Sequence, residues 1–149
     1  SKQESDLHKF IADFKKEFMS LDPEAISFPR SCNNMRKYGS SKDVFIKGSP
    51  IHVKGALIYN HQIKEFKLQH KYPYIQEGDK IKFIKLLEAN PFKFDVISYI
   101  TTLPKEFNLN EYVDYELQFE KTFLDPMKFI LNSIGWEHEK KASLEAFFG

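Results

Sequence analysis

The sequence predicts an α+β fold in which several helices pack on a small antiparallel sheet, followed by an extended C-terminal tail. Apolar residues recur every three to four positions in several stretches, as in amphipathic helices, whereas residues 80–87 and 96–100 are β-branched and aromatic without that period. The 149 residues suffice for one substantial core, and fifteen Phe and seven Tyr predict that aromatic side chains fill it. We expect one domain over residues 1–136 and the tail over residues 137–149.

The N-terminal part of the chain predicts a helix and a short strand. A helix is expected over residues 5–20, because Leu7, Phe10, Ile11, Phe14 and Phe18 recur at intervals of three and four and form one apolar stripe. Asp22-Pro23 ends this helix, and residues 25–28 then predict a short strand that Pro29 terminates.

A second helix is expected from Ser49-Pro50, with the serine hydroxyl as N-cap and the proline at the first helical position. Its inner face would hold Val53, Ala56, Leu57, Asn60 and Ile63. The strands at 80–87 and 96–100 are expected to pair as an antiparallel hairpin, since Asn90-Pro91 turns the chain between them.

Two further helices are expected near the C-terminus. The first, over residues 109–124, has the aromatic stripe Tyr112, Tyr115, Phe119 and Phe123. Asp125-Pro126 is expected to interrupt it and to start the second, which Gly135 closes.

Charge is distributed unevenly along the chain although its net value is only +1. Residues 30–61, called the basic segment below, have six Lys or Arg and one acid, a net charge of +5, whereas residues 106–125 have a net charge of −5. Lys and Arg neutralise phosphates, and short polar side chains and backbone N–H groups donate to phosphate oxygens, so a polyanion-binding surface is one interpretation. A solvated loop with scattered lysines is the other.

Several classes of function find no support in the residues. The sequence has no glycine-rich phosphate loop, no Cys/His metal cluster, no nucleophile elbow and no paired carboxylates flanked by apolar strand. The single cysteine, Cys32, excludes an internal disulfide and suits a reducing compartment. No apolar run approaches the roughly 20 residues of a membrane span, and no signal peptide is evident, so a cytoplasmic location is expected. Because the catalytic motifs named above are missing, the chain is expected to have no active site of its own.

The last residues of the chain combine charge with exposed apolar groups. Residues 137–141 are nearly all charged or His, and Leu144, Phe147 and Phe148 follow at a spacing that places them on one side of a helical turn. Such a plug suits a hydrophobic pocket on a partner; the alternative is that the tail folds back on its own domain.

Six segments, in order and spacing, resemble the C-terminal thumb region of the family B DNA polymerases of T-even-type phages. They are SCNNMRKY (31–38), IHVKGALIYN (51–60), EGDKIKF (77–83), LLEANPF (86–92), LQFEKTFLDPM (117–127) and EKKASLEAFF (139–148). The resemblance runs from the first helix to the last residue.

This resemblance implies that the chain is part of a DNA-directed DNA polymerase, a nucleotidyltransferase of bacteriophage replication, and acts in the host bacterial cytoplasm. The family's thumb is an α+β subdomain that grips the primer–template duplex by its sugar–phosphate backbone. Catalysis belongs to palm aspartates with Mg²⁺, N-terminal to this segment, so the resemblance implies no catalytic residue, metal or cofactor here. The palm and the other polymerase domains would be partners, and the fragment alone would be inactive.

The positions that match duplex-contacting residues of the family are Ser31, Asn33, Lys37, His52, Lys54 and Lys121. Lys47 lies beside a family lysine in a loop of different length, and Lys93 follows the NPF turn; both are included as DNA-binding candidates. Asp125 departs from the family, which often has a basic residue there.

The tail resembles the family's peptide for binding the sliding clamp, with Leu144, Phe147 and Phe148 as the apolar plug and Lys141 where the clamp box has Gln. Tethering to a clamp would raise processivity without new DNA contacts. The alternative function is a free-standing, clamp-recruited interaction protein with a basic DNA- or RNA-binding surface. The two differ in whether this domain fully buries the apolar stripe of its first helix.

Overall fold

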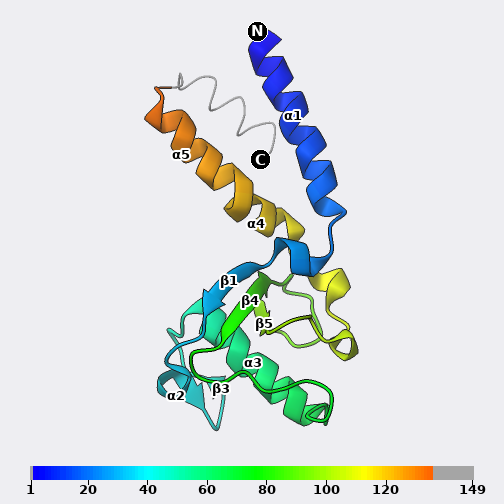
Figure 1. Ribbon diagram of the computed structural model, residues 1–149, viewed down its shortest axis with the longest axis vertical. Coiled ribbons are helices and arrows are strands. Elements are labelled where there is room, and N and C mark those ends of the chain that lie inside the picture. Colours follow the sequence, from blue (N-terminus) through cyan, green and yellow to red (C-terminus); the bar gives the residue numbers. More distant parts are fainter. Residues whose placement is uncertain (1, 136–149) are drawn as a thin grey trace. The chain divides into compact units, whose positions relative to one another are not determined.

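The computed structural model describes residues 2–135 of the chain, and these form two compact units (Figure 1). The sheet unit is Asp22–Asp114, and the helical unit combines the residues up to Leu21 with those from Tyr115 onward. Helices together with a small antiparallel sheet confirm the predicted α+β class. The predicted tail, 137–149, lies outside the described residues, so the division at residue 136 stays a prediction.

The sheet unit is built on three antiparallel strands in the order β1-β4-β5. These strands are β1 (Phe28–Ser31), β4 (Lys80–Lys85) and β5 (Val96–Tyr99). The predicted hairpin is confirmed by the pairing of β4 with β5, in which Phe83 lies opposite Ser98.

The predicted strand at 25–28 was wrong in position. Residues Pro23–Ile26 form a short 3-10 helix, and β1 begins at Phe28 and runs through Pro29. Since β1 is an edge strand, a proline that lacks the N–H donor is tolerated there.

Helix α3 (Ile51–Glu65) packs against β5. Of its predicted inner face, Val53, Ala56 and Ile63 are buried, whereas Leu57 and Asn60 are only partly buried. Its buried residues are Val53, Gly55, Ala56, Ile58, Tyr59 and Ile63. The predicted N-cap was wrong: the hydroxyl of Ser49 donates to the carbonyl of Ile46, and Pro50 occupies the N-cap position.

Gly55 allows α3 to approach β5 closely. A Cβ atom at this position would lie 2.8 Å from the backbone nitrogen of Ser98 and 3.1 Å from the carbonyl carbon of Ile97. Such distances are incompatible with any side chain, so the helix and the strand are in backbone contact here.

Between β1 and α3 the basic segment forms small elements. They are the one-turn helix α2 (Met35–Tyr38) and the hairpin of β2 (Gly39–Ser40) and β3 (Val44–Phe45). The hairpin was not among the predicted elements.

The predicted helix at 109–124 is confirmed over residues 115–124 but was wrong over residues 109–114. Residues Lys105–Phe107 and Asn110–Tyr112 form short 3-10 helices, and Val113 bridges to Leu86 of the sheet unit. Leu109 is 1% exposed and belongs to the core of the sheet unit. The residues of the predicted helix are therefore divided between the two units, at Asp114 and Tyr115.

The helical unit contains α1 (Lys2–Met19) and a second, continuous helical rod of α4 (Tyr115–Phe119), a π-helical turn (Glu120–Leu124) and α5 (Asp125–Ser133). Aromatic rings join the two rods, with Phe14 4.8 Å from Phe123 and Phe18 5.3 Å from Phe119 between ring centroids.

The predicted interruption at Asp125-Pro126 was wrong, because the π turn carries the helix through it. In that turn the N–H of Asp125 donates to the carbonyl of Glu120, five residues back. A proline clashes with the carbonyl four residues before it, and a wider turn just upstream relieves this clash. No helix within residues 2–135 is long and apolar enough to cross a membrane.

Replacing Gly55 with alanine is expected to destabilise the protein by about 1–3 kcal/mol, because α3 must move away from β5 to admit a methyl group. The measurement is the urea midpoint followed by far-UV circular dichroism. Lys64→Ala, on the exposed surface of the same helix, is the control and should change stability by no more than about 0.5 kcal/mol. An unchanged midpoint for Gly55→Ala would show that the close contact does not constrain the fold.

Candidate nucleic-acid interface

The exposed part of the basic segment lies on α2, the β2–β3 hairpin and the loops around them. Of the predicted DNA-binding residues, Ser31, Asn33, Lys37 and Lys47 are exposed. Lys93 is also exposed and has a left-handed backbone conformation, φ 60°, in the turn between β4 and β5.

Five cations of the basic segment have no carboxylate within ion-pair distance among residues 2–135: Arg30, Arg36, Lys37, Lys42 and Lys47. The ammonium of Lys37 lies 5.2 Å from the ring centroid of its neighbour Tyr38. Because these cations have no ion pair among residues 2–135, they can approach a phosphate without first breaking one.

A second group gathers where β1 meets the start of α3. The guanidinium of Arg30 lies 5.6 Å from the ring centroid of Phe83, and the imidazole of His52 lies 6.3 Å from the same ring. Burial, and then the charge of Arg30, lower the pKa of His52 from 6.5, while a hydrogen bond with the backbone of Ser31 acts to raise it. The imidazole is therefore neutral at pH 7 and offers a hydrogen bond rather than a charge.

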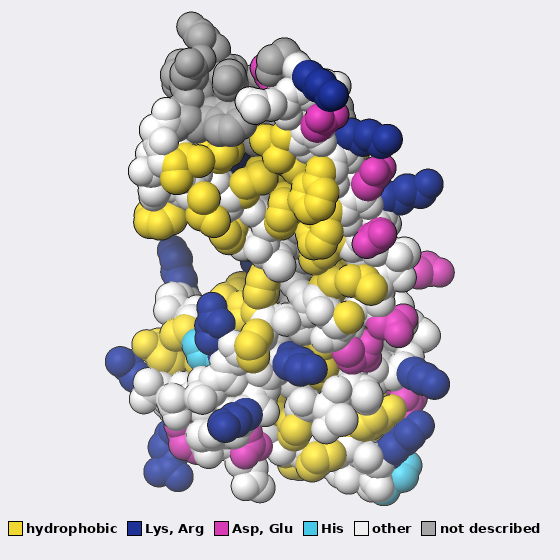
Figure 2. All heavy atoms as spheres, turned by 45° about the horizontal axis from the view of Figure 1, so that its top comes forward, with side chains coloured by type: hydrophobic (Ala, Val, Ile, Leu, Met, Phe, Trp, Pro, Cys, Tyr) yellow, Lys and Arg dark blue, Asp and Glu magenta, His cyan; other side chains and the backbone are white. Residues whose placement is uncertain are grey.

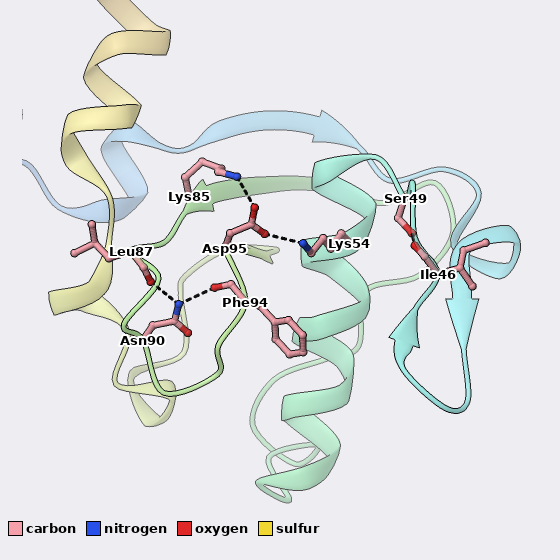
Figure 3. A network of polar contacts seen from close by, with 8 residues as sticks. All are labelled: Ile46, Ser49, Lys54, Lys85, Leu87, Asn90, Phe94 and Asp95. Atoms are coloured by element: carbon pink, nitrogen blue, oxygen red, sulfur yellow. Dashed lines mark hydrogen bonds and ion pairs between the residues drawn. The ribbon is translucent and has the colours of Figure 1, made fainter. Parts of the chain in front are cut away.

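Lys54 is held by a carboxylate rather than left free (Figure 3). Asp95 accepts from the ammonium of Lys54 at 2.8 Å through one oxygen and from that of Lys85 at 2.9 Å through the other. The Lys54 ammonium also lies 4.9 Å from the ring centroid of Phe45, on β3. Partial burial acts to raise the pKa of Asp95, but hydrogen bonds and the charges of the two lysines outweigh it and hold the pKa at about 2.

The turn that carries Lys93 is fixed by a buried amide (Figure 3). Asn90 is 3% exposed and donates through its side-chain nitrogen to the carbonyls of Leu87 and Phe94, at 2.6 and 2.7 Å. Its side-chain oxygen accepts from the N–H of Phe92 at 2.9 Å. The position of Lys93 therefore follows from backbone contacts inside the turn.

A carboxylate also orders the start of α2. The two oxygens of Glu77 accept from the backbone N–H groups of Asn34 and Met35, at 2.7 and 2.9 Å. Burial, and then the charges of Glu77 and Asp79, raise the pKa of Cys32 to about 11. The two acidic groups close to Cys32 in space therefore act on its pKa in the same direction as burial.

Lys121, the remaining candidate, lies on the π turn of the helical unit. It is exposed and its ammonium lies 3.1 Å from Asp125, one turn along the same helix. Such an exposed pair contributes about 0–1 kcal/mol, so Asp125 reduces the local positive charge without immobilising the lysine.

Two lysines of β4, Lys80 and Lys82, were not predicted as part of this surface. Ser31 pairs with Lys80 and Pro29 with Lys82, so both lysines project from the sheet face opposite to Phe83 and Arg30. Pro29, Arg30, Ser31, Lys80 and Ile81 line a hollow of about 260 Å³. The sequence feature that could have identified them is the alternation of Lys80 and Lys82 with Ile81 and Phe83, because such alternation is typical of a strand with one exposed face.

No group of three or more His, Cys, Asp or Glu residues within residues 2–135 could hold a metal ion. The arrangement described above can neutralise phosphates and donate hydrogen bonds to them. The three clamp-binding candidates, Leu144, Phe147 and Phe148, lie outside the described residues.

The chain is similar to two known proteins that are each much longer than it is. It is 29% identical over 150 residues to the DNA-directed DNA polymerase of Enterobacteria phage T4, covering 98% of this chain and 16% of that protein. It is 34% identical over 136 residues to the DNA-directed DNA polymerase of Escherichia phage RB69, covering 88% of this chain and 14% of that protein. The predicted resemblance to a piece of a phage DNA polymerase is confirmed, although no protein-family model matches the chain.

Asp95→Asn is expected to destabilise the protein near pH 7, because Lys54 and Lys85 then repel each other without a shared anion. The Asp95 pKa of about 2 lies below the reference value of 3.8, so its charge stabilises the fold above pH 3.8. That contribution is lost as the pH falls through about 2. Urea denaturation of both proteins from about pH 7 to about pH 2 should show the difference in stability shrinking at the acid end. A difference independent of pH would contradict this role of Asp95.

Proposed function

We propose that this chain is the thumb region, with its C-terminal tail, of a phage family B DNA polymerase, and that it holds the primer–template duplex by the sugar–phosphate backbone. The observation that carries the proposal is the likeness to two phage DNA polymerases over 88–98% of the chain. The five cations of the basic segment without ion-pair partners among residues 2–135 supply the physical means.

In this proposal nucleotidyl transfer and its Mg²⁺ belong to the rest of the polymerase, and the fragment alone is inactive. Within residues 2–135 no group of His, Cys, Asp or Glu could bind the metal, so none of these residues is assigned to it. The chain spans only 14–16% of the length of the curated relatives it matches, and its partners would be the duplex, the other polymerase domains and a sliding clamp, in the host bacterial cytoplasm.

The cations differ in how readily they can bind a phosphate of the duplex. Lys37 is exposed and has no ion-pair partner among residues 2–135, so a phosphate replaces only water around it. Lys54 shares Asp95 with Lys85, and a phosphate would have to compete with that carboxylate. We therefore assign Lys37, Lys47 and Arg36 to phosphate neutralisation and Lys54 mainly to fixing α3, β3 and β5 together.

The alternative, a free-standing interaction protein recruited to a clamp, expects the apolar stripe of α1 to be buried within this domain. Phe10 of that stripe is 60% exposed. This exposure favours a chain that works as part of a larger assembly.

Duplex binding is expected to be independent of base sequence and to weaken steeply with salt, because phosphate neutralisation releases counterions. Lys37→Ala should weaken binding equally on unrelated duplexes and lower the salt slope by about 1. Fluorescence anisotropy of a labelled primer–template across a salt series measures both quantities. Lys64→Ala, an exposed lysine in the last turn of α3, is the matched control and should leave both unchanged. A flat salt response of the unsubstituted chain would refute backbone binding.

Removal of residues 142–149, which contain Leu144, Phe147 and Phe148, is expected to abolish binding to the sliding clamp while leaving duplex affinity unchanged. The reason is that the apolar plug and the basic segment would bind different partners. Surface plasmon resonance with immobilised clamp and anisotropy with DNA measure the two affinities. Ser143→Ala, within the same peptide but outside the plug, is the control. Loss of both activities together would argue against separate surfaces.

A further inference from the structure

The short helix α2 is capped by a side chain from a distant part of the sequence. Its N-cap residue, Asn34, makes no side-chain hydrogen bond to the helix. The carboxylate of Glu77 takes this place: one oxygen accepts from the N–H of Asn34 at 2.7 Å, and the other accepts from the N–H of Met35 at 2.9 Å. Glu77 lies 43 residues after Asn34, so a tertiary contact supplies the acceptors that a local N-cap residue provides in most helices.

Glu77 also holds Asn34 in an uncommon backbone conformation. Asn34 has φ 68° and ψ 30°, in the left-handed region, which residues other than glycine seldom occupy unless surrounding contacts hold them there. The hydrogen bond from the N–H of Asn34 to Glu77 is such a contact. Because Asn34 lies where the chain enters α2, its conformation sets the direction of the helix that carries Arg36 and Lys37.

The turn that carries Glu77 is itself held by hydrogen bonds. The side chain of Asp79 accepts from the N–H of Gln76 at 2.8 Å, and Gly78 has φ 83°, which glycine adopts without steric cost. The turn is also joined to Cys32, just before α2. The N–H of Cys32 donates to the carbonyl of Asp79 at 2.8 Å, and the N–H of Gly78 donates to the carbonyl of Cys32 at 2.6 Å. Glu77 therefore projects from a fixed support.

Helix α2 is bonded in turn to the segment that follows β3. The N–H of Tyr38 donates to the carbonyl of Asn34 at 3.2 Å, and the N–H of Ile46 donates to the carbonyl of Tyr38 at 2.9 Å. In the lower part of Figure 2, which shows one face of the sheet unit, Lys and Arg side chains protrude at separate points. Each such cation depends on the backbone beneath it for its position, so a change at Asn34 would displace several cations together.

We infer that Glu77 is a positioning residue of the duplex-binding surface, and that its carboxylate orients α2 so that Asn33, Arg36 and Lys37 meet phosphates together. The inference rests on the proposed function. By its charge alone, a carboxylate near these cations should oppose the binding of phosphate. If duplex binding becomes weaker when that negative charge is removed, the surface needs Glu77 for its geometry.

The test is fluorescence anisotropy of a labelled primer–template duplex with the whole 149-residue chain and its Glu77→Gln variant. The amide of Gln has one acceptor oxygen, and its NH₂ group would face the second backbone N–H, donor against donor. Glu77→Gln should therefore weaken duplex binding at least about 3-fold, although it removes a negative charge. The salt slope should fall by about 1, as expected when a cation no longer reaches its phosphate.

Two further variants separate geometry from charge. Asp43→Asn removes the single acid of the basic segment, an exposed carboxylate with no ion pair among residues 2–135, and should leave duplex binding unchanged or strengthen it. Glu77→Asp keeps the negative charge but withdraws the carboxylate from the two N–H groups by one methylene, and should weaken binding at least about 2-fold. Because its charge is unchanged, Glu77→Asp tests the positioning role even where Glu77→Gln does not fold.

Hydrogen exchange provides the structural readout. In Glu77→Gln the N–H groups of Tyr38 and Ile46 should exchange faster, because both of their hydrogen bonds depend on the position of α2. The N–H of Leu86, which donates to the carbonyl of Asp95 at 2.9 Å, lies elsewhere in the sheet unit and should exchange at an unchanged rate. That pattern would show a local displacement in a protein that remains folded.

Unchanged or tighter duplex binding by both Glu77 variants would overturn the inference and leave the proposed function in place, since Glu77 would then act only as a charge. Equal weakening by Glu77→Gln and Asp43→Asn would also overturn it, because the effect would not depend on position. Absence of salt-dependent binding by the unsubstituted chain would count against the proposed function and against this inference with it. Weaker binding by both Glu77 variants but not by Asp43→Asn supports the inference.

Discussion

The backbone contact between α3 and β5 determines where the polar groups of the sheet unit lie. With no side chain at Gly55, the helix comes within van der Waals distance of Ser98, whose hydroxyl donates to the carbonyl of His52 at 2.8 Å. His52 and Lys54 lie in the first turn of α3. The contact of α3 with β5 in the core therefore fixes their positions. From there His52 reaches the ring of Phe83 and Lys54 reaches Asp95.

Lysine serves two physical purposes in this unit. Lys54 and Lys85, 23% and 22% exposed, hold one carboxylate between them and tie α3 to the hairpin of β4 and β5. Lys37, Lys42 and Lys47 are exposed and remain hydrated. They form a local concentration of positive charge, while the net charge of the whole chain stays near neutrality.

Sequence patterns predicted the elements whose signals are local. The apolar stripe of α1, the Ser-Pro start of α3 and the β-branched residues of β5 each identify an element without reference to the rest of the chain. Patterns failed where tertiary contacts decide: Pro29 lies within a strand because that strand is at the sheet edge, and Leu109 leaves the helical pattern because it packs into the sheet unit.

The candidate interface shows the same limit. The exposed positions Ser31, Asn33, Lys37 and Lys47 could be predicted, since short polar residues around lysines rarely pack into a core. The ion pair of Lys54 could not, because Asp95 lies 41 residues further along the chain. The same holds for Lys80 and Lys82, whose relation to Ser31 follows only from the pairing of β1 with β4.

The carboxylate of Glu77 holds part of the backbone of the basic segment in place. Its hydrogen bonds to the N–H groups of Asn34 and Met35 fix the backbone around Asn33 and Lys37 from a loop more than 40 residues away. The conformational entropy of that loop is thus lost during folding rather than on meeting a partner. Binding of a polyanion to this surface would then cost little backbone entropy, which favours rapid association and rapid release.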